Sequence, residues 1–211
     1  MKLIIITSPT YIVGEAFLIE KLLSLGIDRV HIRKPSYTEK DTIKLLLKIS
    51  PIFYHRIVLH DYHYLALKYN NIGGIHINKR NPVVPNGYKG KVTASCHSLK
   101  EVSILKNKYN YVFLSPIFNS ISKQGYKSAF THEELLEANK NRIIDEKVYA
   151  LGGVTQKLLR NVHDYGFGGA ALLGDIWNRV AQKDFDNYIL QIIRTAKDLC
   201  KGNVSTTIGQ P

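Results

Sequence analysis

Basic, polar and glycine residues follow the ends of short apolar runs of this sequence, where they could together bind a phosphorylated molecule. Arg33 and Lys34 lie at the end of one run, His60 and Asp61 at the end of another, and Lys79 comes soon after a third. Guanidinium and ammonium groups form charge-assisted hydrogen bonds with phosphate oxygens. An anionic ligand is therefore the first expectation. The alternative is a set of ordinary loops, whose first residues are often polar.

Two glycine-containing turns are the second candidate for phosphate binding. Gly152 and Gly153 follow one apolar run, and Leu173 and Gly174 follow the next. Backbone amides beside glycine can approach an oxygen-rich ligand closely, and a helix N-terminus adds its dipole. One Gly-Gly pair is as typical of a tight turn, but two glycine turns after adjacent strands favour a phosphate site.

The segment 115–125 is too long for a minimal turn between a strand and a helix. It carries Ser120 and Ser122 ahead of Lys123, and Gly125 is a candidate hinge. These side chains predict a mobile loop that brings two hydroxyls and an ammonium group onto a phosphate. A plain surface loop has the same composition.

Asp61 is the candidate ligand for a divalent metal ion. Magnesium prefers oxygen ligands, and a magnesium ion would neutralise part of the charge of a pyrophosphate. The alternative is that Asp61 caps a helix over residues 62–69.

Histidine and cysteine residues near the same run ends raise two further alternatives. A zinc site could be formed by His60, His63, His76 and His97, although their spacing matches no known zinc motif. Cys96 beside His97 could be an activated nucleophile, but a small buried cysteine is the favoured interpretation. Ser95 and His97 are retained as candidate ligand-binding residues.

The elements that must position these residues are eight short runs rich in β-branched side chains. They lie at 3–7, 29–33, 56–60, 73–77, 91–95, 110–115, 147–151 and 168–173. Runs with little alternation are typical of strands buried on both faces in a parallel sheet. Strands alternating with helices predict a compact (β/α)8 TIM barrel, with a doubly wound open sheet as the alternative. In a barrel, the candidate residues would meet at the carboxyl ends of the strands.

Helix signals between the runs support the same architecture. Capping boxes or their aspartate variant are predicted where Thr38 precedes Asp41, Ser98 precedes Glu101, and Thr131 precedes Glu134. Apolar residues at 185, 188, 189, 192, 193, 196 and 199 predict a final amphipathic helix. We expect one barrel domain over 1–201, one or two helices reduced to loops around 79–90, and a flexible tail at 202–211.

Composition narrows the class of protein. The 211 residues are 45% hydrophobic, which excludes a disordered chain, and 29 Lys and Arg against 17 Asp and Glu give a net charge of +12. The basic residues are spread along the chain, which is typical of a solvated surface and argues against a nucleic-acid site. Phosphorylated small molecules remain compatible with the charge as partners, and nucleic-acid binding is the remote alternative. Two distant cysteines exclude a disulfide framework and fit a reducing cytoplasm. Neither a signal peptide nor a membrane span is visible in the sequence.

In their order along the chain, the motifs at the run ends resemble those of the thiamine phosphate synthase superfamily. The matching segments are His31-Ile32-Arg33-Lys34-Pro35, His60-Asp61, Gly74-Ile75-His76-Ile77, Ser95-Cys96-His97-Ser98, Ser115-Pro116-Ile117-Phe118 with Ser120, Ser122 and Lys123, Ala150-Leu151-Gly152-Gly153-Val154, and Gly169 to Ile176. No single segment is decisive, but their joint order is specific.

The resemblance implies an enzyme that joins hydroxymethylpyrimidine pyrophosphate to thiazole phosphate and releases pyrophosphate, and it suggests a homo-oligomer. It implies that Arg33 and Lys123 bind pyrophosphate with Ser120 and Ser122, while Asp61 holds magnesium. It places His31, His60 and Ser95 beside the pyrimidine. It also places the backbone amides of Gly153, Leu173 and Gly174 on the thiazole phosphate.

Three departures from the family pattern affect the pyrophosphate half of the site. Pro35 stands where the family has a lysine, which leaves the neighbouring Lys34 as the candidate replacement, and His60 replaces an asparagine. The second acidic metal ligand is missing, because the segment 78–81 reads Asn-Lys-Arg-Asn. The loss of one of two carboxylates should weaken or abolish magnesium binding.

The related thiazole tautomerases are the close alternative. They bind only the thiazole phosphate and need no metal, and their strand 2 motif matches His31-Ile32-Arg33. Their catalytic histidine, however, aligns with Pro116, which cannot transfer a proton. A metal-free thiazole-phosphate binder of the same family stays open as well.

Overall fold

Eight parallel strands form a closed barrel in chain order, which confirms the predicted TIM barrel and rules out the open sheet. The computed structural model describes residues 1–119 and 128–201. The strands are β1 Lys2–Ile6, β2 Arg29–Ile32, β3 Ile57–Leu59, β4 Gly74–Ile77, β5 Val92–Cys96, β6 Tyr111–Leu114, β7 Val148–Leu151 and β8 Gly169–Leu172. The barrel closes where β1 pairs with β8, with Leu3 opposite Ala170.

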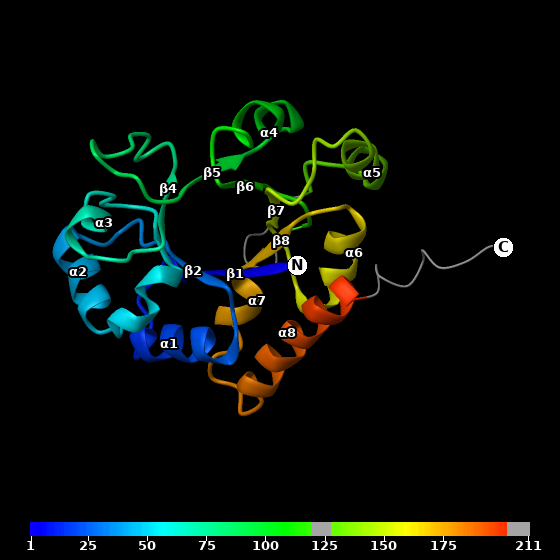
Figure 1. Cartoon of the computed structure of the whole chain (residues 1–211). Helices are drawn as coiled ribbons and strands as arrows, with labels where there is room; N and C mark the ends of the chain where they lie inside the picture. The colour runs from blue at the N-terminus through cyan, green and yellow to red at the C-terminus, as the bar shows by residue number, and fades with distance from the viewer. Residues whose placement is uncertain (120–127, 202–211) are drawn as a thin grey trace.

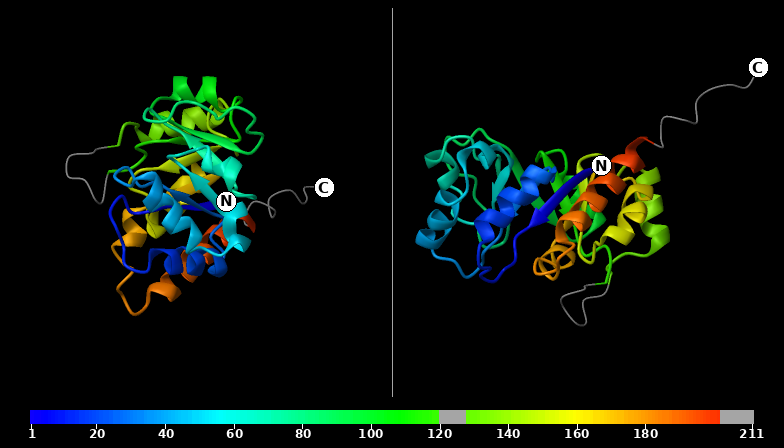
Figure 2. Two further views of the ribbon diagram at one scale, coloured as in Figure 1. Left: turned by 90° about the vertical axis from the view of Figure 1, so that its left-hand side faces the viewer. Right: turned by 90° about the horizontal axis from the view of Figure 1, so that it is seen from below.

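Helices form an outer layer around the strands, as Figures 1 and 2 show. The α-helices are α1 Glu15–Leu25, α2 Glu39–Leu47, α3 Leu65–Lys68, α4 Leu99–Leu105, α5 His132–Lys140, α6 Leu159–Asp164, α7 Gly174–Trp177 and α8 Phe185–Lys201. Two 3-10 helices, η1 Pro51–Arg56 and η2 Gln156–Leu158, complete the layer. Between β4 and β5 the chain forms turns and loops, as predicted. In the described part of the chain, no helix has the length and apolar character needed to cross a bilayer.

The strand sequences lack alternation because both faces of the sheet are buried. On β1, Ile4 and Ile6 belong to an inner cluster with Phe113, whereas Leu3 and Ile5 pack into the larger core between the barrel and the helices. The strands therefore show the continuous apolar pattern of a parallel sheet.

All three residues predicted to cap helices, Thr38, Ser98 and Thr131, are N-cap residues in the structure, but one of the capping boxes is incomplete. Thr38 and Thr131 form complete capping boxes with Asp41 and Glu134. At α4, Ser98 accepts a hydrogen bond from the Glu101 amide, but the Glu101 carboxylate accepts from the His97 amide instead of the cap residue. On α8, the predicted stripe is buried except at Tyr188, which is half-buried. The predicted tail 202–211 lies outside the described residues.

Candidate active site

A cavity of about 940 Å³ opens at the carboxyl ends of the strands. Its lining includes a residue that follows each strand: Ser8, Arg33, His60, Asn78, His97, Ser115, Gly152 and, within β8's turn, Leu173. The barrel therefore brings together candidate residues that are up to about 140 positions apart in sequence, as predicted from the strand order.

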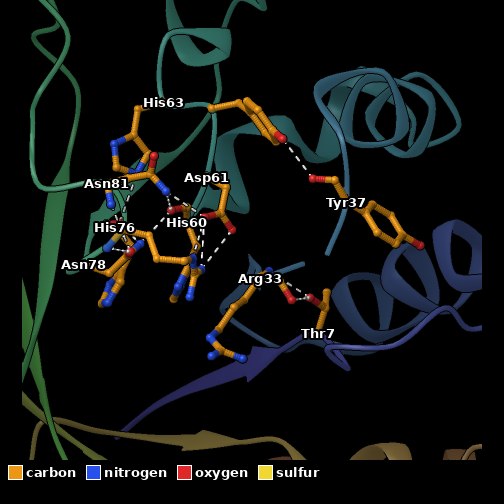
Figure 3. Close-up of polar contacts among 11 residues, drawn as sticks. Thr7, Arg33, Tyr37, His60, Asp61, His63, His76, Asn78 and Asn81 are labelled. Carbon is orange, nitrogen blue, oxygen red and sulfur yellow. Dashed lines mark hydrogen bonds and ion pairs between the residues drawn. The ribbon is translucent and has the colours of Figure 1, made fainter. Parts of the chain in front are cut away.

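A group of three basic side chains lies on the β2 to β4 side of the cavity. Arg33, Lys79 and Arg80 all line it, and among the described lining residues Glu101 is the single acid. The Arg33 peptide is fixed by Thr7, whose hydroxyl accepts from the Arg33 amide at 2.9 Å and donates to the Arg33 carbonyl at 3.2 Å (Figure 3). Burial, followed by the charge of Arg80, lowers the pKa of Arg33 from its usual value. The site favours an anionic ligand.

Asp61 lies beside this group, but its carboxylate is already engaged. Arg80 Nη2 lies 3.0 Å from Asp61 Oδ1 and 3.2 Å from Oδ2, and Asn81 Nδ2 donates to Oδ1 at 2.7 Å. The helix-cap interpretation of Asp61 is wrong, because α3 begins at Leu65 and its N-cap residue is Tyr64. For the metal-ligand interpretation, the carboxylate on the described lining is that of Glu101, which accepts from the His97 amide, and Asp61 itself is not part of that lining. The Arg80 guanidinium takes the place beside Asp61 that a cation would take. These donors do not fit magnesium.

A buried cluster of three histidines lies at the floor of the cavity. His31 Nδ1 and His60 Nε2 are 2.9 Å apart, and His31 Nε2 lies 2.6 Å from the Tyr111 hydroxyl. His76 bridges two hydroxyls, at 2.8 Å from Thr93 and 2.9 Å from Ser95. His60, His76 and Ser95 line the cavity, as does the sequence candidate His97.

The histidines of this cluster are neutral. Burial, followed by neighbouring positive groups, holds the pKa of His31 and His60 well below the usual value and lowers the pKa of His76 to about 3. Their ring nitrogens lie within 4.8 Å of one another, a spacing short enough for a metal ion. The rings of His60 and His76, however, are stacked 4.0 Å apart at 16°, so their in-plane lone pairs do not converge. Hydrogen bonding explains the cluster better than metal ligation.

The proposed zinc set and the proposed cysteine nucleophile are not formed. His63 turns away from the cluster and bonds the carbonyls of His76 and Val83, at 3.0 and 3.3 Å. Cys96 is fully buried, and burial raises the pKa of its thiol to about 12, so the favoured structural interpretation is confirmed.

The two glycine turns close the opposite side of the cavity. Gly152 and Gly153 have φ values of 94° and 66°, which favour glycine. A Cβ on Gly153 would lie 2.3 Å from the carbonyl oxygen of Asn119, so a side chain would not fit. Leu173 and Gly174 open α7 and also line the cavity. A ligand with two anionic groups, or two ligands, could therefore reach both sides.

The family model described as thiamine monophosphate synthase matches residues 3–176, most of the chain. The chain belongs to this family. Membership implies phosphorylated small-molecule substrates.

Relatives and solved structures agree with this assignment. The chain is 25% identical over 173 residues to a thiamine-phosphate synthase of Flavobacterium johnsoniae, covering 75% of this chain and 80% of that protein. It is similar to a thiamine phosphate pyrophosphorylase structure from Bacteroides thetaiotaomicron, with 41% identity, a TM-score of 0.84, and 93% and 98% of the two chains covered. A Pyrococcus furiosus structure of the same description shares the fold at 16% identity, with a TM-score of 0.74 and 94% and 96% of the two chains covered.

Within the thiamine monophosphate synthase family pattern, the role expected for Lys34 needs correction. Its ammonium group forms an ion pair with Glu15 at 2.6 Å and donates to the Thr10 carbonyl at 2.8 Å. The two side chains are 2% and 3% exposed, and Pro35 rather than Lys34 lines the cavity. Lys34 therefore does not replace the lysine that the family has at position 35.

His31 also departs from its expected role, because it is fully buried and does not line the cavity. His31 contacts His60 through its Nδ1 atom, so its effect on a ligand would act through His60. Three further expected residues, Ser120, Ser122 and Lys123, lie outside the described residues.

Arg80 is a site residue that the sequence analysis does not include. The segment 78–81 predicts the loss of an acidic ligand, but the same segment also contains a cation. The signal was present in the sequence, since Arg80 follows β4 as Asp61 follows β3.

Proposed function

We propose that this protein is a thiamine-phosphate synthase that joins hydroxymethylpyrimidine pyrophosphate to thiazole phosphate. The observation that carries the proposal is a single cavity with basic side chains on one side and two glycine turns on the other. A pyrophosphate would bind at Arg33, Lys79 and Arg80, and a phosphate ester at the amides of Gly153 and Gly174.

The reaction starts when the bond between the pyrimidine methylene carbon and the pyrophosphate oxygen breaks, and the electron pair leaves with pyrophosphate. The thiazole nitrogen then gives its lone pair to the methylene carbon, which forms the new carbon–nitrogen bond. Fixed positive charges at the leaving group stabilise the charge that develops on it. We assign this task to Arg33, with Lys123, Ser120 and Ser122 completing the leaving-group site.

The neutral histidines suit the pyrimidine side of the reaction. His60 and Ser95 offer hydrogen bonds to a heterocycle, and His76 holds Ser95 in place. Because burial keeps the pKa of His76 near 3, no imidazolium charge opposes a cationic pyrimidine intermediate.

Magnesium was the cofactor expected from the resemblance, with Asp61 as its ligand. Asp61 contacts Arg80 and Asn81, and we therefore assign no step of the reaction to a metal ion.

The proposal is tested by measuring pyrophosphate release with each substrate alone and with both together. We expect release only with both, and Arg33→Ala should lower kcat/KM by at least about 100-fold because a charge on the leaving group is lost. Arg160→Ala, at an exposed arginine of α6, is the matched control and should leave kcat/KM unchanged. Release that does not depend on the thiazole phosphate would refute the proposal.

One observation favours thiazole tautomerase chemistry as a second candidate. His97 lies in the cavity with Nδ1 3.1 Å from the Ser115 carbonyl, next to Pro116, which stands where the tautomerases have their catalytic histidine. An imidazole from the neighbouring strand could then move the proton. Proton exchange on the thiazole phosphate in EDTA, with no pyrimidine substrate and abolished by His97→Ala, would establish this candidate in place of the synthase.

A further inference from the structure

The contact between Asp61 and Arg80 shows how the basic side of the cavity is built. Both carboxylate oxygens of Asp61 contact the guanidinium, through Nη2 and Nε, and Asn81 takes a further position on Oδ1. The Asp61 side chain is 15% exposed and the Arg80 side chain 44% exposed. Asp61 thus has donors directed at both oxygens, while Arg80 still faces the cavity.

The turn that carries Arg80 is fixed to the end of β3. Asn78 Oδ1 accepts from the amides of Arg80 and Asn81 at 2.9 and 3.2 Å, and Asn78 Nδ2 donates to the His60 carbonyl at 2.7 Å. Figure 3 shows Asn78 and Asn81 grouped around His60 and Asp61. Arg80 is therefore held in place before a ligand arrives, which lowers the entropy cost of binding.

The charges around this turn favour an anion and oppose a divalent cation. Arg33, Lys79 and Arg80 line the cavity, and Glu101 is the single acidic side chain on the described lining. A magnesium ion at Asp61 would lie beside the Arg80 guanidinium and would have to displace it. The planar guanidinium, in contrast, matches the oxygens of a phosphate as well as those of a carboxylate.

We propose that Arg80, positioned by Asp61, replaces the divalent cation of the site, so that pyrophosphate binds through arginine and lysine side chains without magnesium. This inference rests on the proposed function, because pyrophosphate is the leaving group of that reaction. Arg80 would contact the ligand, and Asp61 is a positioning residue.

The test is calorimetric titration of the full-length protein with inorganic pyrophosphate, in EDTA and in excess magnesium. We expect the wild-type protein to bind in EDTA, and Arg80→Ala to weaken binding by about 10-fold to 100-fold, the size of a lost charged hydrogen bond. Arg80→Lys keeps the charge but loses the two-oxygen contact with Asp61, so its affinity should be intermediate. Arg160→Ala again serves as the control.

A second variant tests the replacement in the opposite direction. Arg80→Asp places a carboxylate beside Asp61 and should abolish binding in EDTA, with partial recovery when magnesium is added. Thermal melting would show that the variant is folded, and Arg80→Ala and Arg80→Lys test the inference if it is not.

Three results would overturn the inference: wild-type binding only with magnesium, no pyrophosphate binding in either buffer, or Arg80→Ala with unchanged affinity. Failure of the proposed function gives another pattern, in which pyrophosphate binds in EDTA but is not released from the two substrates. A protein that releases it only with magnesium keeps the proposed function and loses this inference.

Discussion

The buried pair of Lys34 and Glu15 predicts a large loss of stability when one partner is removed. In Lys34→Met the Glu15 carboxylate would stay in a place where it is 3% exposed, without the ammonium group 2.6 Å away. Breaking a buried ion pair in this way costs about 3–5 kcal/mol of unfolding free energy. We therefore expect a loss of this size near pH 8, without loss of pyrophosphate binding.

The loss should depend on pH. Burial raises the pKa of Glu15, and Lys34 acts in the opposite direction. Without Lys34 that pKa rises further, so the folded state of the variant binds a proton at a pH where the unfolded state does not. The stability of Lys34→Met should accordingly rise as the pH falls from about 8 to 5.

The assay is urea unfolding followed by the fluorescence of Trp177, the single tryptophan of the chain. The double variant Glu15→Leu with Lys34→Met should recover most of the loss, because no unpaired charge remains buried. As a control, the same double-mutant cycle on the surface pair Lys21 and Asp186 should give a coupling energy of at most about 1 kcal/mol. If Lys34→Met costs less than about 1 kcal/mol and instead weakens pyrophosphate binding, Lys34 serves the ligand and our interpretation is wrong.

Two further predictions concern the floor and the glycine turns. The pKa of His76 is about 3 in the folded protein, against an ordinary value of 6.5, so the folded state binds fewer protons than the unfolded state. The free energy of unfolding should therefore fall as the pH drops below about 6.5, by up to about 1.4 kcal/mol per pH unit for each such histidine. Urea midpoints that stay constant down to pH 4.5 would contradict this prediction. Gly153→Ala should lower the free energy of unfolding by about 1–3 kcal/mol, because of the φ of 66° and the contact of the new Cβ with Asn119. As a control, Gly87→Ala, where φ is 78° and the space around the Cβ is open, should have a smaller effect in thermal melts. Equal losses in the two variants would show that the contact with Asn119 is unimportant.

The fold was predictable because each strand carries its own signal. β1 and β6 are continuous apolar runs, since the barrel interior and the helices bury both faces. Closure of the barrel brings the carboxyl ends of the strands together, independent of the sequences of the loops. His60, Ser95 and Gly152 could be assigned to one cavity on this ground alone.

The roles of Lys34 and His31 could not be read from residue type. Successive residues of a strand point to opposite faces, so Arg33 continues the inward direction of His31 and Lys34 points out toward α1. The alternation can be read from the sequence, but it assigns a side chain to the inner or the outer face only when the position of the strand in the barrel is known. The buried position of His31 depends on Tyr111, 80 residues away, which no local pattern shows.

The contact between Asp61 and Arg80 depends on tertiary structure in the same way. The two residues are 19 positions apart in separate turns, and only closure of β3 against β4 brings them together. A comparison with the family pattern at single positions therefore shows the missing acid in this segment, but it does not show that Arg80 contacts Asp61.

A crystal structure of the protein soaked with pyrophosphate and thiazole phosphate tests whether the cavity has two separate anion sites. We predict two occupied anion sites in the one cavity, pyrophosphate at Arg33 and Arg80 and the phosphate ester at the amides of Gly153 and Gly174. Both molecules at the same side of the cavity, or either one bound outside it, would show that the basic side chains and the glycine turns do not form two separate anion sites.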